Sequence, residues 1–238
     1  MTPKSTDMAR MLGPPLRLAT VTLPPDARAT YDSHDPAEDP ARAVKHRLVR
    51  EVKRLIELTA HLDVHEADLA EVDVVAEAIR TTTDRLEPMP SLHAKGGLGL
   101  VGGDDGALLE RSGISGRSNP LAAPLQWRMY DDHAEGWATY SAAYEGPAGH
   151  VHGGFVAAAF DDLLGSAQTL SGLAGYTGTL IVRMLRPTPL HKRIDYEAGI
   201  DRVEGRKIFV WGTAHCEGTR LAEAEIVFIA PKDGRRPR

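Results

Sequence analysis

The stretch from Gly146 to Gly165, GPAGHVHGGFVAAAFDDLLG, contains the residues best suited to chemistry. His152 and two glycines precede an apolar segment with helical spacing, which predicts a helix that begins near Gly153. The first backbone N–H groups of a helix have no acceptor within it, and the positive end of the helix dipole lies there. Because glycines leave these groups accessible, they can stabilise a carbonyl oxygen that becomes negative during a reaction, as an oxyanion hole does.

A carboxylate interrupts the same helix. At 100° per residue, small residues and Asp161 share one stripe, with Asp162 on its flank. The stripe consists of Gly154, Ala158, Asp161 and Gly165. Asp161 lies eight residues beyond Gly153, or about 12 Å along the helix axis, so one chain cannot direct both groups at a single carbonyl. An antiparallel two-fold copy would bring the two groups together, which predicts a site shared between subunits.

Simpler interpretations of these residues remain open. His152 and its glycines fit an ordinary strand-to-helix turn, and the two aspartates fit a solvated helix face. His150 and His152 could bind a metal ion, but the pattern supplies no third ligand, and we expect no metal. The sequence GLGLVG at residues 97–102 matches a dinucleotide motif, but no strand precedes it and no helix follows, so we expect no nucleotide cofactor.

Composition excludes several classes of function. The chain has 238 residues, a net charge of −5 and a calculated pI of 6.1, which gives no general attraction to nucleic acid. No apolar run approaches the roughly 20 residues of a membrane-spanning helix. Cys216 is the only cysteine, so no internal disulfide can form, and a reducing, cytoplasmic location is expected.

Three segments follow one another along the chain. Residues 1–40 are rich in Pro, Asp and Ala and predict a flexible lead. Residues 41–117 predict a helical extension, with one amphipathic helix from Ala41, a second that ends before Pro88, and a glycine-rich loop. We expect the two helices to pack on the following domain as a cover. Residues 118–238 predict two strands, the central helix and then strands only.

The last part of the chain predicts an antiparallel meander. Apolar residues alternate with polar ones from Ile194 to Ile200, again in IFVWGTAHC, and again in LAEAEIVFIA, with short turns between the three segments. One long helix followed by such a meander predicts an α+β fold in which the sheet wraps around the helix.

Three separated blocks, EGPAGHVHGGFVAAAFDD, RPTPL and DRVEGRKIFV, resemble the hotdog-fold acyl-CoA thioesterases over residues 118–231. The most similar subgroup contains carboxyl-terminal modulator protein, and the phenylacetate-pathway thioesterases are more distant. The resemblance implies a sheet wrapped around a central helix, a homodimer or dimer of dimers, and hydrolysis of an acyl-CoA substrate at the subunit interface without a cofactor.

The resemblance also implies roles for individual residues. Asp161 matches the catalytic carboxylate, Gly153, next to His152, matches the amide that polarises the thioester carbonyl, and Thr177 matches a hydroxyl that orients the attacking water. The stretches matched to coenzyme A and acyl binding comprise Arg183, Leu185, Arg206, Lys207, Ile208, Phe209, Val210 and Trp211.

One position departs from the more distant relatives, which carry asparagine where this chain has Gly146. The sequence therefore predicts a thioesterase for medium- or long-chain fatty acyl-CoA, with Asp161 as general base or as nucleophile. A non-catalytic protein that binds acyl-CoA or a scaffold is the alternative. A hydratase fits less well, because that chemistry uses an Asp–His pair and the nearest histidines precede Asp161 by nine or more residues.

Overall fold

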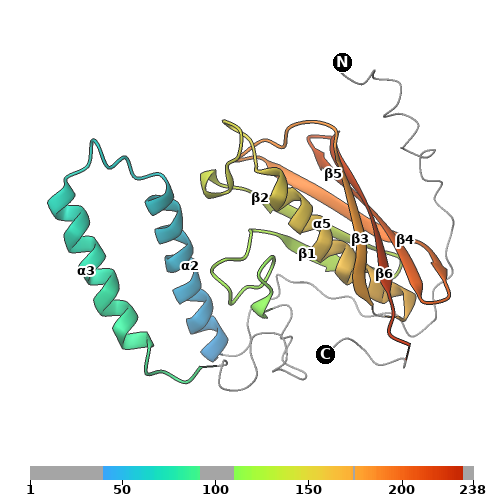
Figure 1. Cartoon of the computed structure of the whole chain (residues 1–238), viewed down its shortest axis with the longest axis horizontal. Helices are drawn as coiled ribbons and strands as arrows, with labels where there is room; N and C mark the ends of the chain where they lie inside the picture. Colours follow the sequence, from blue (N-terminus) through green and yellow to red (C-terminus); the bar gives the residue numbers. More distant parts are fainter. Residues whose placement is uncertain (1–39, 92–109, 174, 233–238) are drawn as a thin grey trace, which may run out of the picture.

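The computed structural model describes residues 40–91, 110–173 and 175–232. A six-stranded antiparallel sheet curves around one helix, and two further helices stand beside this unit (Figure 1). The strands are β1 (Gln126–Met129), β2 (His133–Thr139), β3 (Tyr176–Met184), β4 (Arg193–Glu204), β5 (Lys207–Cys216) and β6 (Thr219–Ile229). The helices are α2 (Pro40–Ala60), α3 (Leu69–Leu86) and α5 (Gly153–Ala167), with 3₁₀ turns η3 (Ala142–Tyr144) and η4 (Gln168–Ser171).

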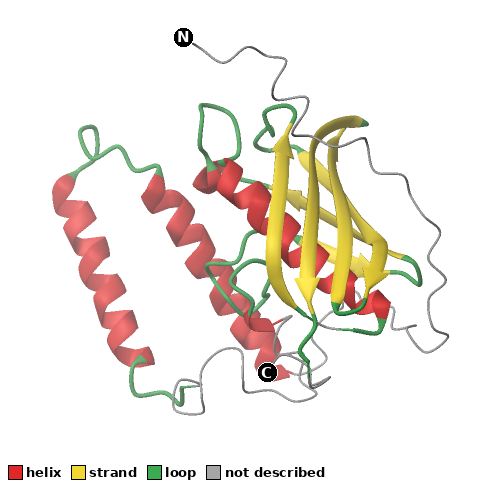
Figure 2. Cartoon of the chain, turned by 45° about the vertical axis from the view of Figure 1, so that its right-hand side comes forward, coloured by secondary structure: helices red, strands yellow, loops and turns green. Residues whose placement is uncertain are grey.

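The strand order is β1-β2-β4-β5-β6-β3, and each neighbouring pair is antiparallel. β4, β5 and β6 form the predicted meander, joined by short turns. β3 pairs with β6 on one side and with no other described strand, so it is an edge of the sheet. The predicted α+β arrangement, with a sheet around a long central helix, is confirmed (Figure 2).

α5 begins at Gly153, as the sequence predicts. Its predicted apolar stripe is buried against the sheet and includes Val156, Phe160 and Leu163, each at most 1% exposed. The helix approaches β5 most closely at Gly212, where a Cβ atom would lie 2.6 Å from the side chain of Leu164. A residue larger than glycine would therefore push α5 away from the sheet.

α2 begins at Pro40, one residue before the predicted start, and α3 ends at Leu86, before Pro88 as predicted, but the expected cover is wrong for α3. No residue of α3 is buried, and α2 buries only His46 and Val49. His46 Nε2 lies 2.8 Å from Oε2 of Glu110, which also accepts a hydrogen bond from Ser118. Burial opposes ionisation of Glu110, but the hydrogen bonds from Ser118 and His46 outweigh it and lower the pKa of Glu110. This contact attaches α2 to the sheet domain.

Two sequence predictions fall outside the described residues: the flexible lead, except for its last residue, Pro40, and the GLGLVG motif at 97–102. The division of the chain at residues 40 and 117 stays a prediction, although residues 110–117 pack partly against α5 through Ser112 and Ser115. In the described part of the chain, no helix is both long and apolar enough to span a membrane.

Candidate active site

The side chain of His152 caps the N-terminus of α5. The imidazole Nδ1 of His152 accepts a hydrogen bond of 3.0 Å from the Gly154 N–H, which satisfies one of the unpaired donors of the first turn. No described residue accepts a hydrogen bond from the Gly153 N–H. A Cβ atom on Gly153 would meet only the terminal methyl of Met184, at 3.6 Å. The Gly153 amide is therefore a donor with no acceptor among the described residues, which suits an oxyanion hole.

Gly146 packs closely against the backbone of His152 and so supports the turn that precedes α5. Its N–H donates to the His150 carbonyl at 2.9 Å, and a Cβ atom at this position would lie 2.7 Å from the Cα of His152. The His152 N–H donates to the Tyr144 carbonyl at 2.9 Å and fixes the histidine from the other side. This backbone cannot carry the asparagine of the more distant relatives without moving, so glycine is required where the cap crosses the preceding chain.

Asp161 lies next to β3. The hydroxyl of Thr177 donates to Oδ1 of Asp161 at 3.2 Å, and of the described residues Thr177 alone donates to this carboxylate. The Asp161 side chain is otherwise exposed in the single chain. The structure thus brings together two of the predicted site residues and leaves Oδ2 of Asp161 to accept a proton from water.

The two parts of the candidate site are separated along α5, because Gly153 is its first residue and Asp161 lies near its middle. Gly153 is near Met184, at the end of β3, whereas Asp161 is near Thr177, at its start. Helix α5 and strand β3 therefore run in opposite directions, and seven residues of extended chain separate Thr177 from Met184, about 24 Å. One chain presents the amide and the carboxylate as separate features.

Asp162 is bound within its own chain. Ser112 donates to its Oδ1 at 3.0 Å, and Ser115 donates to its Oδ2. Burial raises the pKa of Asp162, the negative charge of Asp161 adds to this effect, and the two serine hydroxyls partly offset it. The solvated-face interpretation of the aspartate pair is therefore wrong for Asp162, which anchors the 112–115 turn to α5.

The predicted substrate residues on and after β3 differ in availability. Arg183 Nη1 lies 2.5 Å from Glu225 and 3.6 Å from Glu223, so two carboxylates already balance its charge. Leu185 is 47% exposed, and its N–H donates to the Leu221 carbonyl at 2.8 Å. Of this pair, Leu185 is the residue that offers surface to an acyl chain.

The run from Arg206 to Trp211 divides between two faces of the sheet. Ile208 and Val210 are 0% and 2% exposed and belong to the core under α5, so the expectation that they contact substrate is wrong for the single chain. Alternation along a strand places Phe209 and Trp211 on the outer face, half-buried. The guanidinium of Arg202 lies over the Phe209 ring, with its Cζ atom 3.6 Å from the ring centroid.

The two basic residues of the prediction lie at the start of β5, with Arg206 in the preceding turn and Lys207 as the first residue of the strand. Both are exposed, and Arg206 Nη1 donates to the Ala230 carbonyl at 2.8 Å. In the sheet, Lys207 pairs with Ile229, which pairs in turn with Tyr176, the neighbour of Thr177. Two strand spacings, about 10 Å, therefore separate the Lys207 backbone from the start of β3, at the end of the sheet where Asp161 lies.

Sequence reasoning missed the residues that hold the site from a distance. Ser112 and Ser115 lie about 50 positions before Asp162, and the sequence around them indicates only a loop. The ion pair between Glu225 and Arg183 could not be predicted for the same reason, because it depends on the register between β3 and β6. The alternation of β6 does place Glu225 on the outer face, which was the one available signal. Within residues 40–91, 110–173 and 175–232, no cluster of three metal-binding side chains occurs.

No family model matches the chain. Over 87 residues it is 33% identical to the acyl-coenzyme A thioesterase THEM4 of Mus musculus, a match that covers 36% of this chain and 37% of that relative. A solved thioesterase superfamily protein is 28% identical, with a TM-score of 0.67 over 78% of this chain and 94% of that one. A hypothetical thioesterase from Streptococcus pneumoniae, solved with coenzyme A, is 16% identical, with a TM-score of 0.44 over 48% and 91% of the two chains.

Proposed function

We propose that this chain, which belongs to the hotdog-fold thioesterase family, hydrolyses fatty acyl-CoA of medium or long chain to the free acid and coenzyme A. The observation that carries the proposal is the pair formed by Asp161 and Thr177 near the middle of α5, together with the Gly153 amide at its start, which has no acceptor among the described residues. A carboxylate base and an oxyanion donor are the two groups that thioester hydrolysis needs from a protein.

The site is completed by a second copy. β3 is an edge strand whose exposed residues include Ile181 and Met184, both 46% exposed. Pairing β3 with itself about a two-fold axis reverses its direction, so the Thr177 end of one strand meets the Met184 end of the other. This arrangement brings Asp161 toward the partner subunit's Gly153 and accounts for a site whose halves lie apart in one chain.

In the reaction, Asp161 takes a proton from water while the water oxygen forms a bond to the thioester carbon. The partner's Gly153 N–H donates to the resulting oxyanion. The tetrahedral intermediate then collapses, the C–S bond breaks with its electron pair on sulfur, and the proton held by Asp161 passes to the thiolate. The products are a carboxylic acid and coenzyme A. Thr177 orients the carboxylate so that its second oxygen faces the water.

Lys207, assisted by Arg206, binds coenzyme A phosphates at the end of the sheet where Asp161 lies, because a charged ammonium is exposed there. The acyl chain lies against Leu185 and the outer-face aromatic Trp211. These assignments rest on the resemblance and on exposure, and they predict that Lys207→Ala raises the KM for acyl-CoA while kcat changes little.

The proposal is tested by measuring thiol release from acyl-CoA esters of increasing chain length with the native chain and with Asp161→Asn. We expect turnover by the native chain, highest with medium or long chains, and loss of turnover in the variant. Acyl-CoA binding by the native chain without thiol release would instead support a non-catalytic binding protein. No binding and no release would contradict both functions.

A further inference from the structure

The arm formed by α2 and α3, residues 40–86, leaves its apolar residues uncovered. α2 faces the sheet domain with His46 and Val49, its only buried residues. Val44 and Leu48 lie about 160° from His46 around the helix, on the opposite side. They are 55% and 42% exposed. α2 therefore attaches to its own domain through a largely polar face and presents its apolar face elsewhere.

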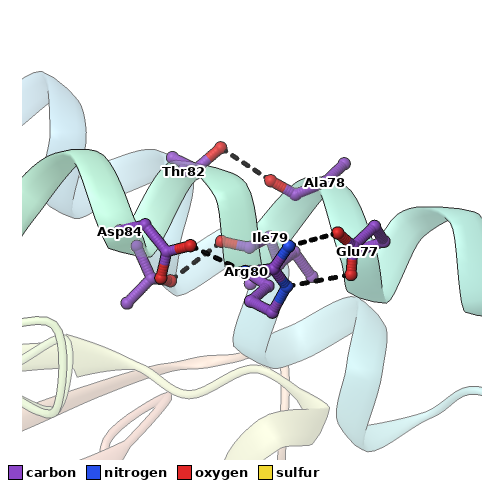
Figure 3. Close-up of polar contacts among 7 residues, drawn as sticks. Glu77, Ala78, Ile79, Arg80, Thr82 and Asp84 are labelled. Atoms are coloured by element: carbon purple, nitrogen blue, oxygen red, sulfur yellow. Dashed lines mark hydrogen bonds and ion pairs between the residues drawn. The ribbon is translucent and has the colours of Figure 1, made fainter.

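α3 is amphipathic, and nothing in the described chain buries it. Its apolar stripe consists of Leu69, Val72, Val75, Ile79 and Leu86. On the opposite face Arg80 bonds to Glu77 at 2.5 Å and to Asp84 at 2.8 Å, whereas Thr82, about 60° from Ile79, donates to the Ala78 carbonyl at 2.9 Å (Figure 3). The charged face is satisfied within the helix, so the face that lacks a partner is the apolar one.

We propose that the arm packs against the arm of a second copy of this chain, so that two α2–α3 pairs form a four-helix bundle. α2 carries six Arg and Lys residues against two Glu, a net charge of +4, and α3 carries four acidic residues against two Arg, a net charge of −2. A second copy supplies an acidic α3 for each basic α2, together with a matching apolar stripe.

The size of the uncovered surface fits this partner. The two helices have 21 and 18 residues, so each is about 30 Å long, and two helices about 10 Å wide present roughly 600 Å² on one side. A standard interface buries about 800 Å² per partner. Burial of the arm alone approaches that value, and α2 and α3 run side by side in both views (Figures 1 and 2).

An anionic lipid surface fits less well, because the acidic α3 would be repelled from it. Such a surface attracts basic helices, and only α2 is basic. If the 39 residues before α2 covered the stripes instead, cysteines placed on the apolar stripes of two chains would cross-link no better than a pair with one cysteine on the charged face. If a lipid surface covered them, the arms would bind anionic vesicles without cross-linking to one another.

The test joins two chains through their arms. A Leu48→Cys chain with one affinity tag is mixed with an Ile79→Cys chain with another, and both are oxidised mildly after subunit exchange. Both positions lie near the middle of their helices, and Cys216 is buried, so it does not compete. In the control, Thr81→Cys on the charged face of α3 replaces Ile79→Cys. Circular dichroism confirms that each variant retains its helices.

We expect at least roughly tenfold more mixed-tag disulfide product from the Leu48–Ile79 pair than from the control, because paired arms hold the two thiols at a high effective concentration. Equal yields would overturn the proposal. A single chain that carries both Leu48→Cys and Ile79→Cys and forms only an internal disulfide would also overturn it, because α2 and α3 would then pack on each other. Arms that bind phosphatidylglycerol vesicles without forming mixed product would overturn it as well. Thiol release is not the readout, so failure here is distinct from failure of the proposed reaction.

Discussion

The N-terminus and the middle of α5 differ in how their functional groups are held. At the N-terminus, the His152 side chain and the close approach of Gly146 fix a backbone amide that has no acceptor among the described residues. Eight residues later, Asp161 is exposed and is held by a single hydroxyl, that of Thr177. In the proposed reaction, the constrained N-terminus supplies a donor that must not move as charge develops, and the less constrained middle of the helix supplies a base that must exchange protons. Because the two groups are separated in one chain, we propose that two subunits form the site.

The largest effect is expected at the carboxylate end. Asp161→Asn keeps the shape of the side chain but removes the base, so kcat for thiol release should fall by about 10²–10⁴-fold, the usual contribution of a positioned base. Steady-state thiol release measures this loss. Asp162→Asn is the matched control on the adjacent residue and should retain most of the activity. Equal losses in the two variants would assign no special role to Asp161.

At the amide end, Gly153→Pro removes the donor while keeping the helix, because proline is tolerated at the first helical position. We expect kcat to fall by about 10²–10³-fold, as for loss of one oxyanion-hole donor. Gly153→Ala retains the N–H, and its Cβ would make only an ordinary contact with Met184. The alanine variant should therefore remain active. A proline variant as active as the alanine variant would exclude this amide from the chemistry.

A smaller effect is expected from the hydroxyl that holds the base. Thr177→Val removes the hydrogen bond to Asp161 without changing the size of the side chain much. The loss in kcat should be roughly fivefold, as for a bond worth about 1 kcal/mol. Thr179→Val, also exposed on β3, is the control. If both variants behave as the native chain does, Thr177 does not orient the carboxylate.

The smallest effect on turnover is expected at Asp162, where stability changes instead. Burial raises the pKa of Asp162, so the folded chain binds this proton more tightly than the unfolded chain does. Its contribution to stability is complete below the unfolded pKa of about 3.9 and is lost as the pH rises through the folded pKa. The Tm of the native chain relative to Asp162→Asn should therefore decline as the pH rises from about 4 to 7. A difference in Tm that does not vary with pH would contradict this account.

The features that could be predicted from the sequence depend on local residue patterns, whereas those that could not depend on contacts between segments far apart in the chain. The start of α5 at Gly153, its buried stripe and the β4–β6 meander follow from periodicity and from turn residues. The serines that bind Asp162 and the absence of any packing partner for α3 within the described residues could not be predicted, because both depend on which segments meet in space.

The strand period corrects one prediction that was taken from the resemblance. The resemblance implies one binding segment at residues 206–211. Side chains alternate between the two faces of a strand, which places Ile208 and Val210 in the core and Phe209 and Trp211 on the outer face. A residue-by-residue comparison with a family does not by itself distinguish the two faces of a strand.

The central claim is that one site combines Asp161 of one subunit with Gly153 of the other. Coexpression of Asp161→Asn chains and Gly153→Pro chains with different tags, followed by tandem purification, isolates mixed dimers. Each mixed dimer then has one site with both groups intact and one site with neither. We expect thiol release near half that of the native dimer, far above either variant alone. Activity no higher than that of the separate variants, with mixed dimers verified by mass, would show that each site lies within one chain.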